Sequence, residues 1–432
     1  MILLNGRSTI CIIDKSLKKY TIRFAFGCLL FLQVATIAHS KPSVTTGLDR
    51  LVAEQFKSLE HKHVGLIANQ TSRTFDGQFG PELLKHAKGV HLVALFAPEH
   101  GLLGTRTAGA QSDSIEHFEG IPVYSLYGST RRPTKKMLKG IDLLVFDLQD
   151  IGVRPYTYLS TMIEAMQAAA DAHIAFMVLD RPNPLSGTRV EGNLRDSNLR
   201  SFVGVVPIPY IHGMTLGELA KMAVGESWIT NAKHLTLTVM SCIGWKRSEY
   251  WPQTGLSWVA PSPNIPHFDN AVGCAILGAT GELGLISIGI GGTEPFLVLG
   301  SNAIKPESLL RAAQSSFPQG LQWQLDSFAA VVNGMTKHFI GIRMHLPSDL
   351  GRMGPFYPGQ FQLLSDMMRD SALRAGFDAT STERILMFQK VTGTKAIAKS
   401  LEAGQNVQPI IDGWANEVTL FLKRRSKYLL YR

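Results

Sequence analysis

The sequence predicts an α/β protein built on a parallel sheet with helices on both faces. One observation is that short apolar runs alternate with amphipathic segments between residues 64 and 180. The other is that each run is β-branched or aromatic and nearly continuous in hydrophobicity, as expected of strands covered on both sides. The five predicted strands lie at 64–69, 90–97, 121–127, 142–148 and 174–180.

Helices are predicted between and after these strands. Three lie between strands, from Pro81 to Lys88, from Pro133 to Lys139 and from Thr157 to His173. Thr215 and Glu218 have the spacing of a capping box, which predicts a helix that reaches about Val224. A further strand is expected at 235–239. Helical stretches that alternate with short strands are expected from 306 to 432.

The first forty residues have the pattern of a secretory signal peptide. A cationic segment precedes an apolar run at 24–38, and the small residues Ala38 and Ser40 follow with cleavage-site spacing. The alternative is a single membrane anchor, but the run is shorter than the roughly 20 apolar residues that a spanning helix needs. We therefore expect cleavage after residue 40, export to the periplasm or the extracellular space, and no stable membrane association afterwards.

The composition indicates a globular protein without a nucleic-acid partner. The chain has 432 residues, of which 45% are hydrophobic and 18% are charged, and this excludes a disordered or fibrous protein. Its net charge is +9, but 38 basic and 33 acidic residues follow residue 40, so the excess there is small. No basic run is interleaved with aromatic residues, as a single-strand binder would require.

Neither a cofactor nor a metal is expected. No G-x-G-x-x-G follows the first predicted strand, no G-x-x-x-x-G-K-[ST] occurs, and no H-E-x-x-H or comparable cluster is present. Export would leave two cysteines, Cys242 and Cys274, which can form one disulfide but cannot form a zinc cage. The fold therefore does not depend on a disulfide framework.

Polar side chains follow all five predicted strands at the point where each strand ends. Because the carboxyl ends of parallel strands share one edge of the sheet, these side chains are expected to gather into a site for a polar ligand. Glu99, Asp147 and Asp150 are the candidate catalytic carboxylates. The candidate substrate-binding residues are Asn69, His100, Arg154, Tyr156, Asp180, Arg181 and Asn183.

Each candidate also has a structural interpretation, which the sequence leaves open. Glu99 can cap a helix or pair with a cation instead of acting in catalysis. Asp147 lies inside an apolar strand and must have a partner, such as a backbone amide or Arg154. Asp180 and Arg181 can form a local ion pair that closes a turn. His100 can be a histidine whose ring nitrogens are hydrogen-bonded within the protein.

Several motifs of the chain, taken in order, resemble those of the NamZ-type exo-β-N-acetylmuramidases. The resemblance covers essentially all of the chain after residue 40. The motifs include V-G-L-I-A-N-Q-T, L-F-A-P-E-H-G-L-L-G, P-V-Y-S-L-Y-G, D-L-Q-D-I-G-V-R-P-Y-T-Y, V-L-D-R-P-N-P, T-G-L-S-W-V-A-P-S-P-N-I-P and R-R-S-K-Y-L-L-Y. It is weakest at 278–293, where many relatives carry E-G-T-N and E-G-R-G-T segments and this chain has Glu282 as its only acid.

The resemblance implies a two-domain enzyme that acts on peptidoglycan. It implies a Rossmann-like catalytic domain, placed here at 41–290, and a smaller α/β domain at 291–432 that closes the cleft. The implied activity is removal of terminal β-1,4-linked N-acetylmuramic acid from the non-reducing end of peptidoglycan fragments. The glutamate of the family's P-E-H-G motif, here Glu99, is the implied catalytic residue.

A glycosidase mechanism gives each candidate a hypothetical role. Such enzymes usually need an acid that protonates the leaving oxygen and a second carboxylate. We take Glu99 as the acid and Asp147 or Asp150 as the second group, and Arg154 or Arg181 as the partner of the lactyl carboxylate of muramic acid. A non-catalytic binder of cell-wall fragments is the alternative. An esterase is disfavoured because the G-x-S-x-G elbow is absent.

Overall fold

The computed structural model of the chain describes residues 43–107, 109–110, 115–317 and 320–432. The predicted signal peptide lies outside these residues. Within them, no helix is both long enough and apolar enough to cross a membrane. Residues from 41 onward belong to one compact unit.

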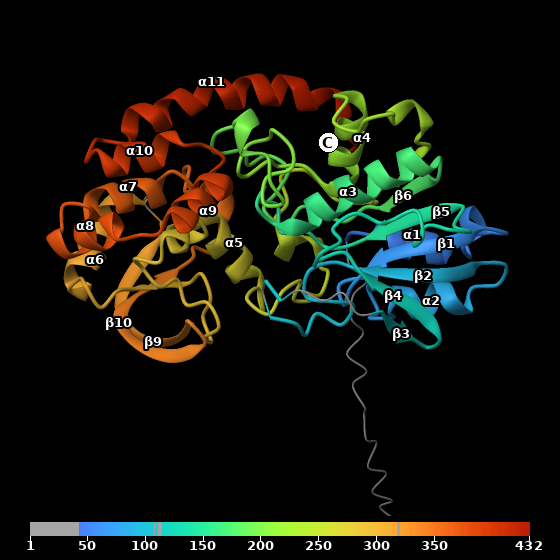
Figure 1. Ribbon diagram of the computed structural model, residues 1–432, viewed down its shortest axis with the longest axis horizontal. Coiled ribbons are helices and arrows are strands. Elements are labelled where there is room, and N and C mark those ends of the chain that lie inside the picture. The colour runs from blue at the N-terminus through green and yellow to red at the C-terminus, as the bar shows by residue number, and fades with distance from the viewer. Residues whose placement is uncertain (1–42, 108, 111–114, 318–319) are drawn as a thin grey trace, which may run out of the picture. The chain divides into compact units, whose positions relative to one another are not determined.

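A seven-stranded sheet forms the N-terminal part of this unit (Figure 1). Its spatial order is β3-β4-β2-β1-β5-β6-β7, and every neighbouring pair is parallel except the edge pair β3–β4. Numbered along the chain, the parallel strands follow the doubly wound order 3-2-1-4-5-6. The strands are β1 (His63–Ala68), β2 (His91–Ala97), β3 (Glu116–Phe118), β4 (Ile121–Ser125), β5 (Leu143–Asp147), β6 (Ala175–Leu179) and β7 (Leu237–Met240).

Helices cover both faces of the sheet, as the sequence predicts. On one face, α3 (Thr157–Ala172) and α4 (Leu216–Gly225) bury their apolar sides against residues such as Phe146 and Phe176. On the other face, α1 (Gly47–Ala53) and α2 (Gly80–His86) pack on residues such as Leu66 and Val145. Because each strand offers apolar side chains to both layers, its sequence shows no polar alternation.

The predicted elements of this part are confirmed with one exception. The five strands, the strand near 235–239 and the helix from Thr157 are present, and Thr215 and Glu218 form a complete capping box at the start of α4. The helix predicted from Pro133 to Lys139 is wrong, because this segment forms turns. Gly140, with φ of 78°, ends the segment.

The C-terminal part contains a small antiparallel sheet and helices. The sheet has the order β8-β10-β9. Its elements are β8 (Val298–Gly300), β9 (Gln322–Val332) and β10 (Met335–His345), and the accompanying helices are α5 (Phe268–Leu277), α6 (Pro306–Ser316), α7 (Gly359–Met367), α8 (Ser371–Asp378), α9 (Thr382–Thr392), α10 (Ala396–Glu402) and α11 (Gln408–Arg425).

This arrangement corrects the expectation of helices alternating with short strands. The long strands form one hairpin, and the helices that follow it run on without another strand in the part that the structure describes. Asn333 and Gly334, both with positive φ, make the two-residue turn of the hairpin. This dipeptide suits the turn type that matches the twist of paired strands.

Buried polar contacts join the C-terminal part to the sheet. Glu191, in the loop after β6, pairs with Arg189 and accepts hydrogen bonds from the backbone N–H groups of Phe356 and Tyr357, both at 2.9 Å. The C-terminus returns beside α4 (Figure 1), where the backbone N–H of Leu430 donates to Glu218 in the first turn of that helix. The two parts are therefore tied together by polar contacts as well as by apolar packing.

We predict that Glu191→Ala destabilises the protein by roughly 3–5 kcal/mol, because it leaves the buried guanidinium of Arg189 without its carboxylate. Lys85→Ala is the matched control, since the Lys85–Glu119 pair lies at the surface and should contribute less than about 1 kcal/mol. Denaturant unfolding of both variants measures the difference. Equal losses would show that Glu191 does not hold the two parts together.

Candidate functional site

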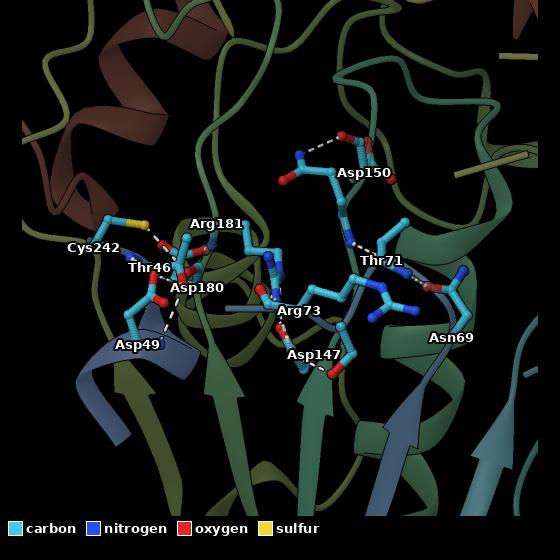
Figure 2. A network of polar contacts seen from close by, with 12 residues as sticks. Thr46, Asp49, Asn69, Thr71, Arg73, Asp147, Asp150, Asp180, Arg181 and Cys242 are labelled. Atoms are coloured by element: carbon cyan, nitrogen blue, oxygen red, sulfur yellow. Dashed lines mark hydrogen bonds and ion pairs between the residues drawn. The ribbon is translucent and has the colours of Figure 1, made fainter. Parts of the chain in front are cut away.

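A buried ion pair joins the carboxyl end of β5 to the loop after β6 (Figure 2), next to the point between β1 and β5 where the strand order reverses. The Arg181 guanidinium donates to Asp147 through Nε at 2.6 Å and through Nη2 at 2.9 Å. Ser72 donates a further hydrogen bond to Asp147 at 2.5 Å. The partner of Asp147 is therefore Arg181, and the expected local pair between Asp180 and Arg181 is replaced by this contact. Both charges are engaged inside the protein.

Asp180 is also engaged with its neighbours. Its carboxylate accepts hydrogen bonds from Thr215 Oγ1 at 2.7 Å, from the backbone N–H of Gly217 at 2.8 Å and from the Tyr431 hydroxyl at 2.5 Å. Burial raises the pKa of Asp180 to about 6 despite these donors. The side chain thus joins the N-terminus of α4 to the C-terminal segment. These contacts indicate that Asp180 has a structural role.

Arg154 reaches into the core, not toward a ligand. It is 1% exposed, and its guanidinium donates to four backbone carbonyl groups at 2.7–3.2 Å. The acceptors belong to Asn193, Ile208, Val391 and Thr392. The expectation that Arg154 binds a substrate carboxylate is corrected on this geometry, because its donors already link the sheet to the end of α9.

The two predicted asparagines and His100 shape turns. Asn69 accepts hydrogen bonds from the backbone and hydroxyl of Thr71, and Asn183 accepts one from the backbone of Leu185. His100 has φ of 73°, and its Nδ1 lies 2.9 Å from the Arg106 carbonyl oxygen. These side chains position the loops around the site and keep little hydrogen-bonding capacity for a ligand.

Glu99 lies beside the N-terminus of α3. Its Oε2 accepts a hydrogen bond from the Thr157 hydroxyl at 2.8 Å, and its Oε1 accepts one from the backbone N–H of Gly109 at 2.9 Å. The Tyr127 hydroxyl is a third partner. The side chain is oriented from three separate segments, and the helix N-terminus favours its negative charge.

Asp150 is the second carboxyl near this helix end. Its Oδ1 accepts a hydrogen bond from the backbone N–H of Gly152 at 2.7 Å, whereas its buried Oδ2 has no partner among the described residues. Burial raises the pKa of Asp150 to about 7. Burial also raises the pKa of Tyr156, and the charges of Asp150 and Glu99 both raise it further. Both acids therefore act electrostatically on the same tyrosine.

Tyr127 and Thr157 are functional candidates that the sequence reasoning missed. Burial, together with the charge of Glu99, raises the pKa of Tyr127 to about 12, so its hydroxyl remains a donor at neutral pH. Tyr127 ends the predicted strand 121–127, so its position at a strand terminus was an available signal. The sequence places Thr157 at the start of a predicted helix. Its hydrogen bond to Glu99 depends on the tertiary structure, which the sequence does not show.

Two protein-family models match the chain. The N-terminal model of exo-beta-N-acetylmuramidase NamZ matches residues 64–269, and the C-terminal model matches residues 273–431. The chain belongs to the exo-beta-N-acetylmuramidase NamZ family. The peptidoglycan beta-N-acetylmuramidase NamZ of Bacillus subtilis strain 168 is 35% identical over 438 residues, which cover 96% of this chain and 100% of that protein.

Two solved structures share the fold of this NamZ-family chain. One DUF1343 family protein of Bacteroides fragilis has a TM-score of 0.83 and 38% identity, and the match covers 91% of this chain and 100% of that one. A second from the same organism has a TM-score of 0.67 and 27% identity, with 90% and 99% covered. The two-domain α/β architecture is therefore confirmed, while the boundary at 290 stays a prediction.

One large cavity of this NamZ-family chain is not lined by Glu99. It has a volume of about 870 Å³ and is lined by residues from 278 to 384, including much of the loop at 278–293 and Glu282. None of the predicted site residues lines it. A small cavity of about 10 Å³ touches Asp150 and Arg181, which is room for about one water. Cys242 and Cys274 are free thiols.

The raised pKa of Asp150 predicts that the stability of the folded protein changes with pH. Its pKa is raised from 3.8 to about 7 on folding, so the folded state holds the proton more tightly. This contribution is complete below about pH 4 and is lost as the pH rises through 7. Asp150→Asn cannot ionise, so we expect it to match the parent near pH 4 and to be more stable by up to about 4 kcal/mol at pH 8.

Thermal unfolding at several pH values measures this effect. Asp147→Asn is the control, because it removes the partner of the buried Arg181 and should destabilise the protein at pH 8. If Asp150→Asn and the parent have the same stability at every pH, Asp150 is ionised in the folded protein and the assignment fails.

Proposed function

We propose that the chain is an exo-acting glycoside hydrolase that releases terminal β-1,4-linked N-acetylmuramic acid from the non-reducing end of peptidoglycan fragments. Family membership over residues 64–269 and 273–431 makes the chain a glycosidase, and the Bacillus subtilis relative supports peptidoglycan as the substrate. The observation that carries the proposal is that Glu99 is the predicted carboxylate held beside the N-terminus of α3 by donors from three segments.

We propose roles for the two carboxylates that differ from those inferred from the sequence. Thr157, Gly109 and Tyr127 all donate to Glu99, which suits a group that acts in its ionised form as a base, as a nucleophile or as a stabiliser of an oxocarbenium-like transition state. A general acid works best with a pKa near the operating pH. Asp150, with a pKa of about 7, fits this role, whereas Asp147 is bound to Arg181.

We predict that two substrates separate these roles. A 4-nitrophenyl muramide has a leaving group that departs as a stabilised anion, whereas a β-1,4-linked disaccharide needs a proton on its leaving oxygen. Asp150→Asn should therefore lose about 10²–10⁴-fold in kcat on the disaccharide and much less on the nitrophenyl substrate. Glu99→Gln should lose a similar factor on both substrates.

Steady-state kinetics with purified full chain tests this assignment. Glu99→Gln that retains nitrophenyl turnover but loses disaccharide turnover would make Glu99 the acid, as the sequence suggests. A parent protein that binds muramyl saccharides and releases no N-acetylmuramic acid would instead be the non-catalytic binder. Product analysis after digestion of glycan chains shows whether release begins at the non-reducing end.

We also propose that residues 1–40 direct export, since peptidoglycan lies outside the cytoplasmic membrane. The support is the cationic segment, the apolar run at 24–38 and the small residues Ala38 and Ser40. N-terminal sequencing of the exported protein is expected to begin at Lys41. A mature protein that still carries the apolar run would indicate a membrane anchor.

A further inference from the structure

A cation beside Glu99 is required if the enzyme is to recognise the lactyl carboxylate of muramic acid. The two arginines expected to do this, Arg154 and Arg181, are engaged in the interior with backbone carbonyl groups and with Asp147. Moving either guanidinium toward a ligand would leave buried acceptors or a buried carboxylate without a partner, which is costly. An ion pair with the lactyl carboxylate would therefore need another cation near Glu99.

Arg131 lies next to the residue that hydrogen-bonds to Glu99. Its guanidinium carbon is 5.5 Å from the ring centroid of Tyr127 and 4.7 Å from that of Phe202. The Tyr127 hydroxyl is bonded to Glu99, and the positive charge of Arg131 acts on that same hydroxyl by lowering its otherwise raised pKa. Tyr127 is thus the common neighbour of the acid and the arginine.

The guanidinium of Arg131 is also available to a ligand. The side chain is exposed, and within the described part of the chain it forms no ion pair or hydrogen bond. A guanidinium that stacks on aromatic rings keeps its N–H groups free in its own plane. The rings of Tyr127 and Phe202, 5.9 Å apart, also restrict its rotation, so less side-chain entropy is lost when an anion binds.

We propose that Arg131 binds the lactyl carboxylate of the sugar whose glycosidic bond is cleaved at Glu99. This inference rests on the proposed function and deepens it by naming a specificity-determining residue. The planar guanidinium pairs with a carboxylate through two parallel hydrogen bonds, which distinguishes muramic acid from N-acetylglucosamine by charge and by geometry.

Arg132 supplies a matched control in the neighbouring position. It is exposed and has the same charge, but it pairs with Glu164 at 2.6 Å and lies 3.9 Å from Asp171. Its guanidinium is therefore directed to the surface of α3. Arg131→Ala and Arg132→Ala remove the same charge from adjacent residues, so a general effect of charge on the enzyme should be similar in both variants.

The test uses substrates that differ only at the recognised group. These are a 4-nitrophenyl muramide with a free lactyl carboxylate, its neutral lactyl methyl ester, and the corresponding glucosaminide. The parent and Arg132→Ala are expected to prefer the acid over the ester by about 10- to 100-fold in kcat/KM, mainly through KM. Arg131→Ala should lose this preference, and Arg131→Lys should keep part of it. Thermal unfolding checks that all variants are folded.

Binding of free N-acetylmuramic acid and of its methyl ester, measured by calorimetry, gives a readout without turnover. Arg131→Ala that retains the parent's preference for the acid, in binding or in kcat/KM, would overturn the inference while leaving the proposed function intact. A parent that cleaves none of the three substrates would contradict the proposed function, and the binding data would still decide the role of Arg131.

Discussion

The buried ion pair between Asp147 and Arg181 is the contact on which the architecture of the site depends. It joins the carboxyl end of β5 to the loop that follows β6, and Ser72 and the carbonyl oxygen of Arg73 bring in the loop after β1. Removing one partner would leave a charge in the interior, so the three loops are held together strongly. The edge of the sheet where ligands bind in such folds is thereby fixed.

Most of the predicted site residues are held in such interior contacts and are not free to contact a substrate. A charge that holds the loops together cannot also pair with a substrate, and this applies to Asp147, Arg154, Asp180 and Arg181. The groups proposed to act on the substrate lie instead toward the N-terminus of α3. There the positive end of a sixteen-residue helix and the Thr157 hydroxyl hold the Glu99 carboxylate.

The strands could be predicted from the sequence because hydrophobic continuity is a local property of each segment. Polar partners could not, because a side chain such as Arg154 reaches carbonyl groups more than two hundred positions away. The sequence also contains a local signal for the long hairpin, because Asn333-Gly334 lies between its two strands and is typical of a tight turn. By contrast, nothing in the sequence places Thr157 or Gly109 beside Glu99.

Tyr127 contacts both Glu99, the proposed catalytic carboxylate, and Arg131, the proposed partner of the lactyl carboxylate. One end of its side chain hydrogen-bonds to Glu99, and its ring contacts the guanidinium of Arg131. Because its pKa is raised to about 12, the hydroxyl stays protonated wherever the enzyme is folded at ordinary pH, and the hydrogen bond to Glu99 persists. The orientation of the acid and that of the cation are therefore set by one strand end, just beyond β4.

This arrangement makes the energetic roles of the three side chains interdependent. Loss of the Tyr127 ring would remove a donor from Glu99 and at the same time free Arg131 to rotate, so its effect cannot be divided into a catalytic part and a binding part. Groups that share a partner in this way are expected to show coupling energies rather than additive ones. The proposed recognition of the sugar's charge and the proposed catalytic role of Glu99 then depend on the same tyrosine.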